Sequence, residues 1–121
     1  MTLAGLTEMV ARFADQRDWG QFHSPKNLVM ALAGEVGELA AEFQWLSPEE
    51  SFDVIDGASK GAAVQDEIAD VVLYLVRLAD VLGVDLLAVA RAKLERNEVR
   101  FPAEQARQRS AKYRDLRGCH R

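Results

Sequence analysis

The chain has 121 residues and a formal net charge of −4, and 49% of its residues are hydrophobic and 28% charged. This composition is typical of one globular domain. Membrane insertion and secretion are not expected, because no apolar run approaches roughly 20 residues and the N-terminus does not resemble a signal peptide. We therefore expect a cytoplasmic protein. The single cysteine, Cys119, excludes a disulfide framework or a cysteine metal cluster within one chain.

Charge divides the chain into an acidic body and a basic tail. Residues 1–102 contain 9 Lys or Arg and 17 Asp or Glu, whereas residues 103–121 contain 6 and 2. We expect the body to be the folded domain. Its acidity argues against binding to duplex nucleic acid, because neutralisation of phosphates dominates the affinity of such proteins. The tail is either a solvated end or a segment that reaches an anionic ligand or a neighbouring subunit.

Two stretches in the first half of the chain have apolar residues at every third or fourth position. The first predicts a helix that begins near Leu3 and ends in the polar run 15–18. Ser24 is a good N-cap and Pro25 suits the first helical position, so a second helix starts there. The second helix is expected to run to about Trp45.

The second half of the chain predicts two more helices. Residues 47–62 contain two glycines and little periodicity, which favours a long connector or a weak short helix. A third helix is expected from about Ala62 to Leu82, and a fourth from the N-cap Asp85 to about Arg100. No stretch reads convincingly as a strand. The sequence therefore predicts an all-α protein, a four-helix bundle.

The third expected helix is apolar on nearly all sides. Its main apolar stripe consists of Val64, Ile68, Val71, Leu75, Leu78 and Leu82. Val72 and Val76 fall on the opposite side, so both faces need to be covered. In so short a chain the second cover is most simply another subunit, which predicts a homo-oligomer.

Two of the expected helices carry the same acidic pattern, E-x-x-[ED]. Glu35 and Glu38 lie on the second helix, and Glu67 and Asp70 lie on the third. Each pair borders its apolar stripe, so the four carboxylates would converge where the helices pack. No Lys or Arg follows any of them at the fourth position, and partly buried like charges need a cation among them. The pattern favours a metal site over ordinary boundary acids.

The donor set indicates which metal is expected. Carboxylates alone suit Mg²⁺ or Mn²⁺, whereas di-iron bundles usually add histidines, which neither helix has. Such a site suits hydrolysis of a phosphoanhydride, with the metal activating water and neutralising the leaving group. A second interpretation stays open, in which the chain is a non-catalytic nucleotide-binding or oligomerisation module with the same helices.

Further motifs give the chain a resemblance to a known family. K-x-x-x-N-x-x-R-F-P occupies residues 93–102, R-D-W residues 17–19, F-H-S-P-K-N-L residues 22–28, and F-Q-W residues 43–45. Together with the acidic motifs, they resemble the all-α MazG-like nucleoside triphosphate pyrophosphohydrolases, in particular the dCTP pyrophosphatase branch.

The resemblance implies an activity and an assembly. A Mg²⁺-dependent house-cleaning enzyme would hydrolyse a (deoxy)nucleoside triphosphate, dCTP or a modified pyrimidine deoxynucleotide, to the monophosphate and pyrophosphate. The MazG-like catalytic domain would occupy residues 1–102. Members of this branch are tetramers, so the resemblance implies a homotetramer, as a dimer of dimers.

The resemblance also implies roles for individual residues. The metal ligands and catalytic acids would be Glu35, Glu38, Glu67 and Asp70, with Glu38 or a neighbouring acid as the general base. The substrate-binding residues would be Trp19, Trp45, Tyr74, Lys93 and Asn97. Of these, Lys93 and Asn97 would contact the triphosphate, the two tryptophans would form the pocket for base and sugar, and Tyr74 would lie beside the site. His23 is either a plain connector residue or a ligand contact.

One position departs from the family pattern. The dCTP-preferring relatives have a histidine nine residues before the tryptophan of R-D-W, and this chain has Val10 there. A polar group that would contact the base is therefore missing. Because a hydrogen-bonding site discriminates between bases and an apolar one does not, the preference for cytosine stays open.

Overall fold

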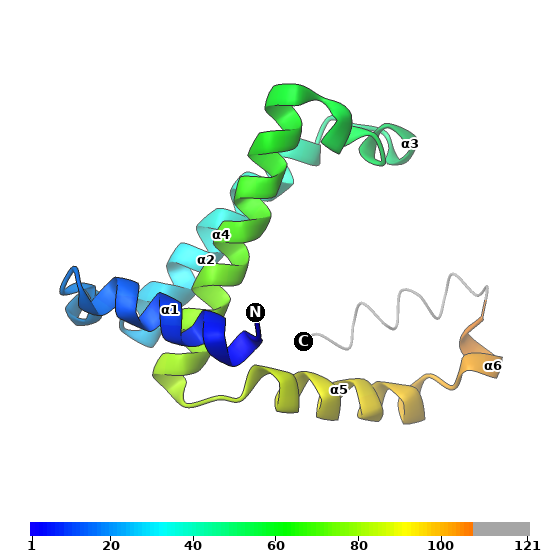
Figure 1. Ribbon diagram of the computed structural model, residues 1–121. Helices are drawn as coiled ribbons and strands as arrows, with labels where there is room; N and C mark the ends of the chain where they lie inside the picture. The colour runs from blue at the N-terminus through cyan, green and yellow to red at the C-terminus, as the bar shows by residue number, and fades with distance from the viewer. Residues whose placement is uncertain (108–121) are drawn as a thin grey trace. The chain divides into compact units, whose positions relative to one another are not determined.

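A computed structural model describes residues 1–107 of the chain, and most of these residues are helical (Figure 1). The elements in chain order, with η denoting a 3₁₀-helix, are α1 (Leu3–Asp15), η1 (Trp19–Phe22), α2 (Pro25–Phe43), α3 (Pro48–Ser51), η2 (Val54–Asp56), α4 (Ala58–Leu82), α5 (Leu86–Arg100) and α6 (Ala103–Ala106). No strand occurs within residues 1–107, so the expected all-α class is confirmed. From residue 108 on, the basic tail lies outside the described residues.

The chain forms two compact units, Met1–Val84 and Asp85–Arg121. In the first unit, α2 and α4 run side by side in opposite directions, and α1 packs across α4 (Figure 1). In the second unit, α5 is followed by the short helix α6. Throughout the described part of the chain, no helix is both long and apolar enough to cross a membrane.

The core of the first unit is small and lies between these helices. Its most deeply buried side chains are Ala14 of α1, Leu28 of α2, and Val64 and Val76 of α4. The expected apolar stripe on α4 is therefore correct only in part, because Val76 is buried while Ile68 and Leu75 are 48% and 40% exposed. When apolar residues lie on all sides of a helix, the sequence pattern does not show which side is buried.

Local capping fixes where the helices begin. The Ser24 hydroxyl accepts a hydrogen bond from the Asn27 backbone N–H at the start of α2, and the Asp85 carboxylate accepts one from Ala88 at the start of α5. Both starts agree with the sequence prediction. Gly83, with φ at 68°, adopts the left-handed conformation that ends α4.

The expected start of the third helix is wrong by one turn. Helix α4 begins at Ala58 instead of near Ala62, and the preceding connector contains α3 and η2. Gly61 does not break the helix. A Cβ at this position would collide with the backbone carbonyl of Ile55 in η2, so Gly61 allows η2 to pack against the first turn of α4.

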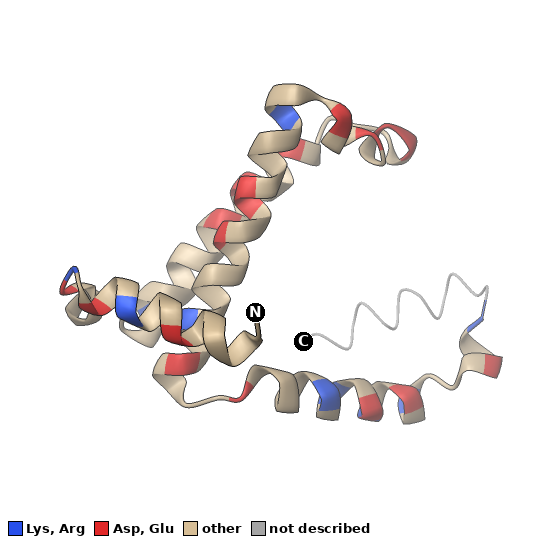
Figure 2. Cartoon of the chain, viewed as in Figure 1, with Lys and Arg blue, Asp and Glu red and all other residues tan. Residues whose placement is uncertain are grey.

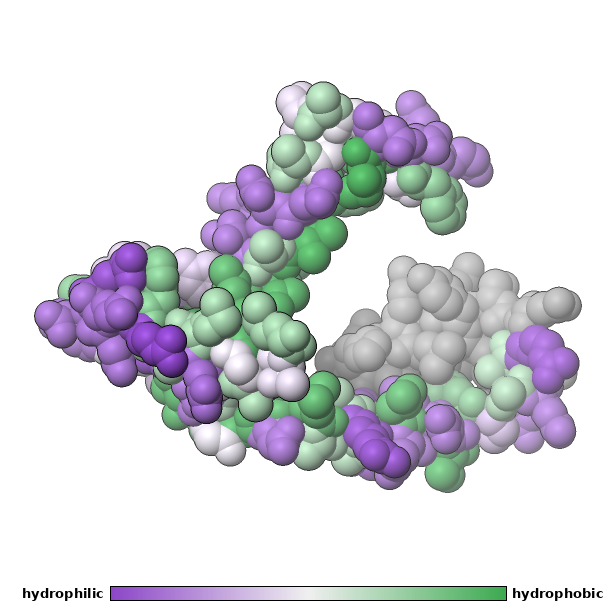
Figure 3. Space-filling model, viewed as in Figure 1, coloured by the Kyte–Doolittle hydropathy of each residue, from purple (hydrophilic) through white to green (hydrophobic). Residues whose placement is uncertain are grey.

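Hydrophobic side chains remain exposed on the first unit. Along α4, Ile68, Val72 and Leu75 are each at least 40% exposed in the single chain. Figure 3 shows hydrophobic surface on the visible face along the α2–α4 pair. This exposure agrees with the expected two-sided apolarity of α4.

Candidate metal centre and adjoining cavity

Helices α2 and α4 bring three carboxylates together. Glu35 and Glu38 lie one turn apart on α2, and Glu67 lies on α4. One carboxylate oxygen from each lies within 4.8 Å of the other two. Figure 2 shows acidic residues on successive turns of α4 where it runs along α2. The paired acidic motifs thus meet at the contact between the two helices, and we call these three residues the acidic cluster.

The acidic cluster is partly buried and lacks a protein counter-ion. One oxygen of Glu35 and one of Glu67 are buried without a hydrogen-bond partner in the described structure. The three ion pairs found in residues 1–107, Lys60–Glu42, Arg77–Asp80 and Arg91–Glu95, leave the cluster out. A buried carboxylate oxygen without a partner costs free energy, so this arrangement calls for a ligand that the protein itself does not supply.

The proximity of the carboxylates changes the acidity of Glu67. A proton on Glu67 would allow it to hydrogen-bond to Glu35; this effect, followed by burial and by the hydrogen bond and charge of Glu38, raises the pKa of Glu67 from 4.5 to about 7. Without a cation, the cluster therefore holds a proton in place of a third negative charge. Clustered carboxylate oxygens, two of them buried and unpartnered, are the donors that a hard divalent cation prefers. The residues present fit such an ion.

Asp70, the fourth expected ligand, lies on α4 three residues after Glu67 and is half-buried. Its carboxylate is not among the three that lie within 4.8 Å of one another. The structure therefore brings together three of the four expected ligands and places the fourth on the adjoining turn of the same helix.

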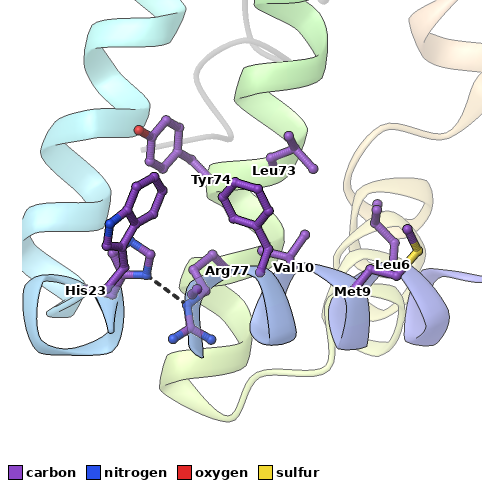
Figure 4. A pocket seen from close by; sticks show the side chains of 10 residues that line it. Leu6, Met9, Val10, His23, Leu73, Tyr74 and Arg77 are labelled. Atoms are coloured by element: carbon purple, nitrogen blue, oxygen red, sulfur yellow. Dashed lines mark hydrogen bonds between the residues drawn. The ribbon is translucent and has the colours of Figure 1, made fainter. Parts of the chain in front are cut away.

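A cavity of about 300 Å³ lies in the first unit, between α1, η1 and α4 (Figure 4). Its lining consists of Leu6, Met9, Val10, Phe13, Ala14, Trp19, His23, Leu73, Tyr74 and Arg77. Most of this wall is apolar. Tyr74 stands two helical turns after Glu67 on α4, so the same helix contributes to the acidic cluster and to the cavity.

Two of the expected substrate-binding residues line the cavity, Trp19 and Tyr74. The Trp19 ring packs edge-on against Phe13, with 5.5 Å between ring centroids, and against His23 at 6.3 Å. These contacts fix the indole at the wall of the cavity. Val10 forms part of the same wall, so the position where the family resemblance implies a histidine is apolar surface here.

The remaining expected substrate-binding residues do not line this cavity. Trp45 lies in the turn after α2 with 87% of its surface exposed. Lys93 and Asn97 are half-buried, one turn apart on α5, and belong to the second unit.

Arg77 is a cavity residue that no sequence motif singled out, and the motifs leave the role of His23 open. Arg77 lines the cavity, and its Nε–H donates a hydrogen bond to His23 Nδ1 at 3.0 Å. A signal was present in the sequence, because Arg77 is the only basic residue in the otherwise apolar and acidic second half of α4. What the sequence could not show is that the connector after η1 folds back onto this helix.

Paired helices with an acidic cluster at their contact, together with an apolar cavity that shares helix α4, define an all-α protein with a candidate divalent-cation centre. Residues 31–116 match the MazG-like family. Two curated relatives, both called dCTP pyrophosphatase 1, are similar over 115 residues, which is 95% of this chain and 68% of theirs: the Homo sapiens protein at 45% identity and the Bos taurus protein at 44%. The chain belongs to the MazG-like family, and the resemblance drawn from its motifs is confirmed.

A solved structure agrees with this assignment. The crystal structure of a pyrophosphatase from Archaeoglobus fulgidus matches with a TM-score of 0.76 and 37% sequence identity, covering 82% of this chain and 91% of that chain. The chain is therefore similar to this pyrophosphatase in fold as well as in sequence.

Proposed function

We propose that the chain is a nucleoside triphosphate pyrophosphohydrolase that converts dCTP, or a modified pyrimidine deoxynucleoside triphosphate, into the monophosphate and pyrophosphate. The observation that carries this proposal is the acidic cluster, whose three carboxylates converge with two buried oxygens unpartnered. The relatives named dCTP pyrophosphatase 1 and the pyrophosphatase of known structure support the activity.

The residues that would hold the metal are Glu35, Glu38 and Glu67, with Asp70 on the adjoining turn completing the set. Mg²⁺ suits these oxygen donors, and Mn²⁺ is the alternative. Once bound, such an ion supplies positive charge for the phosphate oxygens and increases the acidity of water. The carboxylates would hold the ion in place, and its positive charge would offset the repulsion between them.

Proton transfer falls to the same carboxylates. Glu38 is exposed, unlike Glu35 and Glu67, so its free oxygen can accept a proton from water that enters from solvent. We propose Glu38 as the general base, with the neighbouring acids sharing the proton because their titrations are coupled. In-line attack of water on the phosphate chain would release pyrophosphate.

The cavity is the proposed site for base and sugar. Its volume of about 300 Å³ is at the small end for organic ligands, and its wall offers the flat faces of Trp19 and Tyr74 for stacking. Trp45 is proposed for the same role from its motif. Lys93 and Asn97 are proposed to contact the triphosphate, because a cation and an amide one turn apart on a helix suit phosphate oxygens.

We further propose that residues 1–102 form the catalytic domain, that residues 103–121 form a basic tail, and that the chain assembles as a homotetramer without binding duplex nucleic acid. The exposed apolar side chains of α4 support self-association, because a folded monomer would leave them in water.

The test is product analysis with a panel of common and base-modified nucleoside triphosphates, with and without Mg²⁺. We expect monophosphate and pyrophosphate in equal amounts, only when Mg²⁺ is present, and highest for a pyrimidine deoxynucleotide. Release of orthophosphate and a diphosphate would contradict the proposed bond cleavage. Nucleotide binding without turnover would instead favour the non-catalytic module.

A further inference from the structure

The cavity contains a hydrogen bond that the proposed function does not use. Arg77 of α4 donates its Nε–H to Nδ1 of His23, which follows η1, across 3.0 Å (Figure 4). Both residues line the cavity. The Arg77 side chain is only 12% exposed, and a second guanidinium nitrogen, Nη1, lies 3.4 Å from the Asp80 carboxylate. The pair therefore joins two elements that are 54 residues apart in the chain.

The chemistry of this contact determines where the imidazole proton is. An arginine Nε always carries a hydrogen and has no acceptor capacity, so His23 Nδ1 must be the acceptor. A neutral imidazole has a single N–H, which is then on Nε2. No hydrogen bond within residues 1–107 uses Nε2 of His23, so this donor remains available for a ligand.

The surroundings also disfavour a positively charged imidazole. A proton on Nδ1 would face the Arg77 N–H, and none of the ten residues that line the cavity is Asp or Glu. Asp80, which is outside this lining, contacts Arg77, and Tyr74 is the other titratable group in the wall. Burial, and then the charge of Arg77, accordingly lower the pKa of His23.

We propose that Arg77 is a positioning residue of the cavity, which holds His23 as the neutral Nε2–H tautomer so that the imidazole offers a bound ligand one hydrogen-bond donor and no acceptor. The ligand class that fits is a planar heterocycle with a carbonyl oxygen or ring nitrogen as acceptor. The identification of the ligand as a pyrimidine nucleotide rests on the proposed function. The assignment of the His23 tautomer is independent of it.

The tautomer can be observed directly by ¹⁵N NMR of the imidazole rings in the full chain. The chain has two histidines, so His120, which lies outside the described residues, serves as the internal reference. We expect His23 to be a single Nε2–H tautomer at neutral pH. A dominant Nδ1–H tautomer, or an equal mixture, would overturn the proposal without any variant being made.

The Arg77→Met variant tests the role of the guanidinium. Methionine keeps an apolar stem of similar length but cannot donate to Nδ1, so we expect mixed tautomers and a His23 pKa closer to 6.5. Arg77→Lys retains a group that only donates and should restore part of the effect. Arg91→Met is the matched control, because Arg91 donates its Nε–H to Glu95 at an exposed site on α5. An unchanged tautomer in Arg77→Met would contradict the proposal.

Ligand binding is tested with dCMP as the probe and dCTP as the substrate. We expect dCMP to shift the His23 Nε2–H signal, and Arg77→Met to raise KM for dCTP about twofold while kcat changes little, because only the fraction of chains with the Nε2–H tautomer can donate to the ligand. If dCMP leaves the signal unmoved, the ligand role of His23 is wrong. If the wild-type chain turns over no nucleotide, the proposed function fails while the tautomer result stands.

Discussion

Glu35 on α2 and Glu67 on α4 each bury one carboxylate oxygen, and neither oxygen has a hydrogen-bond partner within residues 1–107. Two packed helices thus bring like charges together at a contact where a simple bundle would place apolar side chains. The repulsion between these carboxylates lowers the stability of the metal-free fold, and a bound cation would remove it. Stability and activity should therefore respond in opposite directions when one of these charges is removed.

The Glu67→Gln variant tests whether stability and activity change in opposite directions. Without metal, the variant should melt at a higher temperature than the wild type, because it removes the charge that Glu35 and Glu38 repel. With Mg²⁺, its activity should fall by more than about a hundredfold, since a ligand is lost. Calorimetry in a chelator and an assay of pyrophosphate release measure the two effects. Glu8→Gln, at an exposed position on α1, should change neither.

The stability of the metal-free protein should depend on pH in a defined direction. The pKa of Glu67 is about 7 in the folded chain against an ordinary 4.5, so the folded state retains a proton that the unfolded state has lost between these values. The contribution of Glu67 to the free energy of unfolding is therefore at its largest below about pH 4.5, and it is lost as the pH rises to about 7.

Denaturant unfolding at a series of pH values, in chelator, measures this dependence. His23 acts in the opposite direction, because a lowered pKa reduces stability as the pH falls below 6.5. The difference between wild type and Glu67→Gln at each pH isolates the contribution of Glu67. A difference that stays constant across the range would refute the coupling.

Gly61 should tolerate no side chain. In Gly61→Ala the new Cβ meets the Ile55 carbonyl, and backbone cannot move aside cheaply, so we expect a loss of about 1–3 kcal/mol. Gly34→Ala is the matched control on α2, where nothing lies within 4 Å of the added atom. That change should stabilise the helix by about 0.5–1 kcal/mol. Equal effects in the two variants, measured by chemical denaturation, would count against this packing.

The apolar face of α4 should mediate self-association. Val72 is 41% exposed in the single chain, between the exposed residues Ile68 and Leu75. A lysine at this position would bury a charge in any interface that covers the face, so Val72→Lys should shift the protein to a smaller species. Light scattering after size-exclusion chromatography measures the mass. A wild-type chain that is already monomeric would contradict the proposed assembly.

Much of the fold could be predicted because its signals are local. The caps at Ser24 and Asp85 and the apolar periodicity fixed most helix boundaries. The predicted start of α4 was wrong because a glycine in the sequence resembles a helix breaker. Position 61 is glycine for a different reason, which is the close packing of η2 against α4. Only the folded chain distinguishes the two.

The candidate site was predictable to the extent that it repeats a motif. Glu35, Glu38 and Glu67 converge because both E-x-x-[ED] motifs lie along the α2–α4 contact, although Asp70, the second acid of the α4 motif, is not one of the three. Arg77 was not predictable from periodicity, since its partner His23 comes from a connector whose path no local pattern describes.

The most direct test of the central claim is the Mg²⁺ dependence of pyrophosphate release from dCTP, measured side by side for the wild type and Glu38→Gln. Glu38 is exposed, so the substitution by glutamine should leave the fold intact. A melting curve of the same sample is the control for this. The account predicts release that requires Mg²⁺ in the wild type and is abolished in the variant. Release without a divalent cation, or a fully active Glu38→Gln, would contradict the assignment of the acidic cluster as the metal centre.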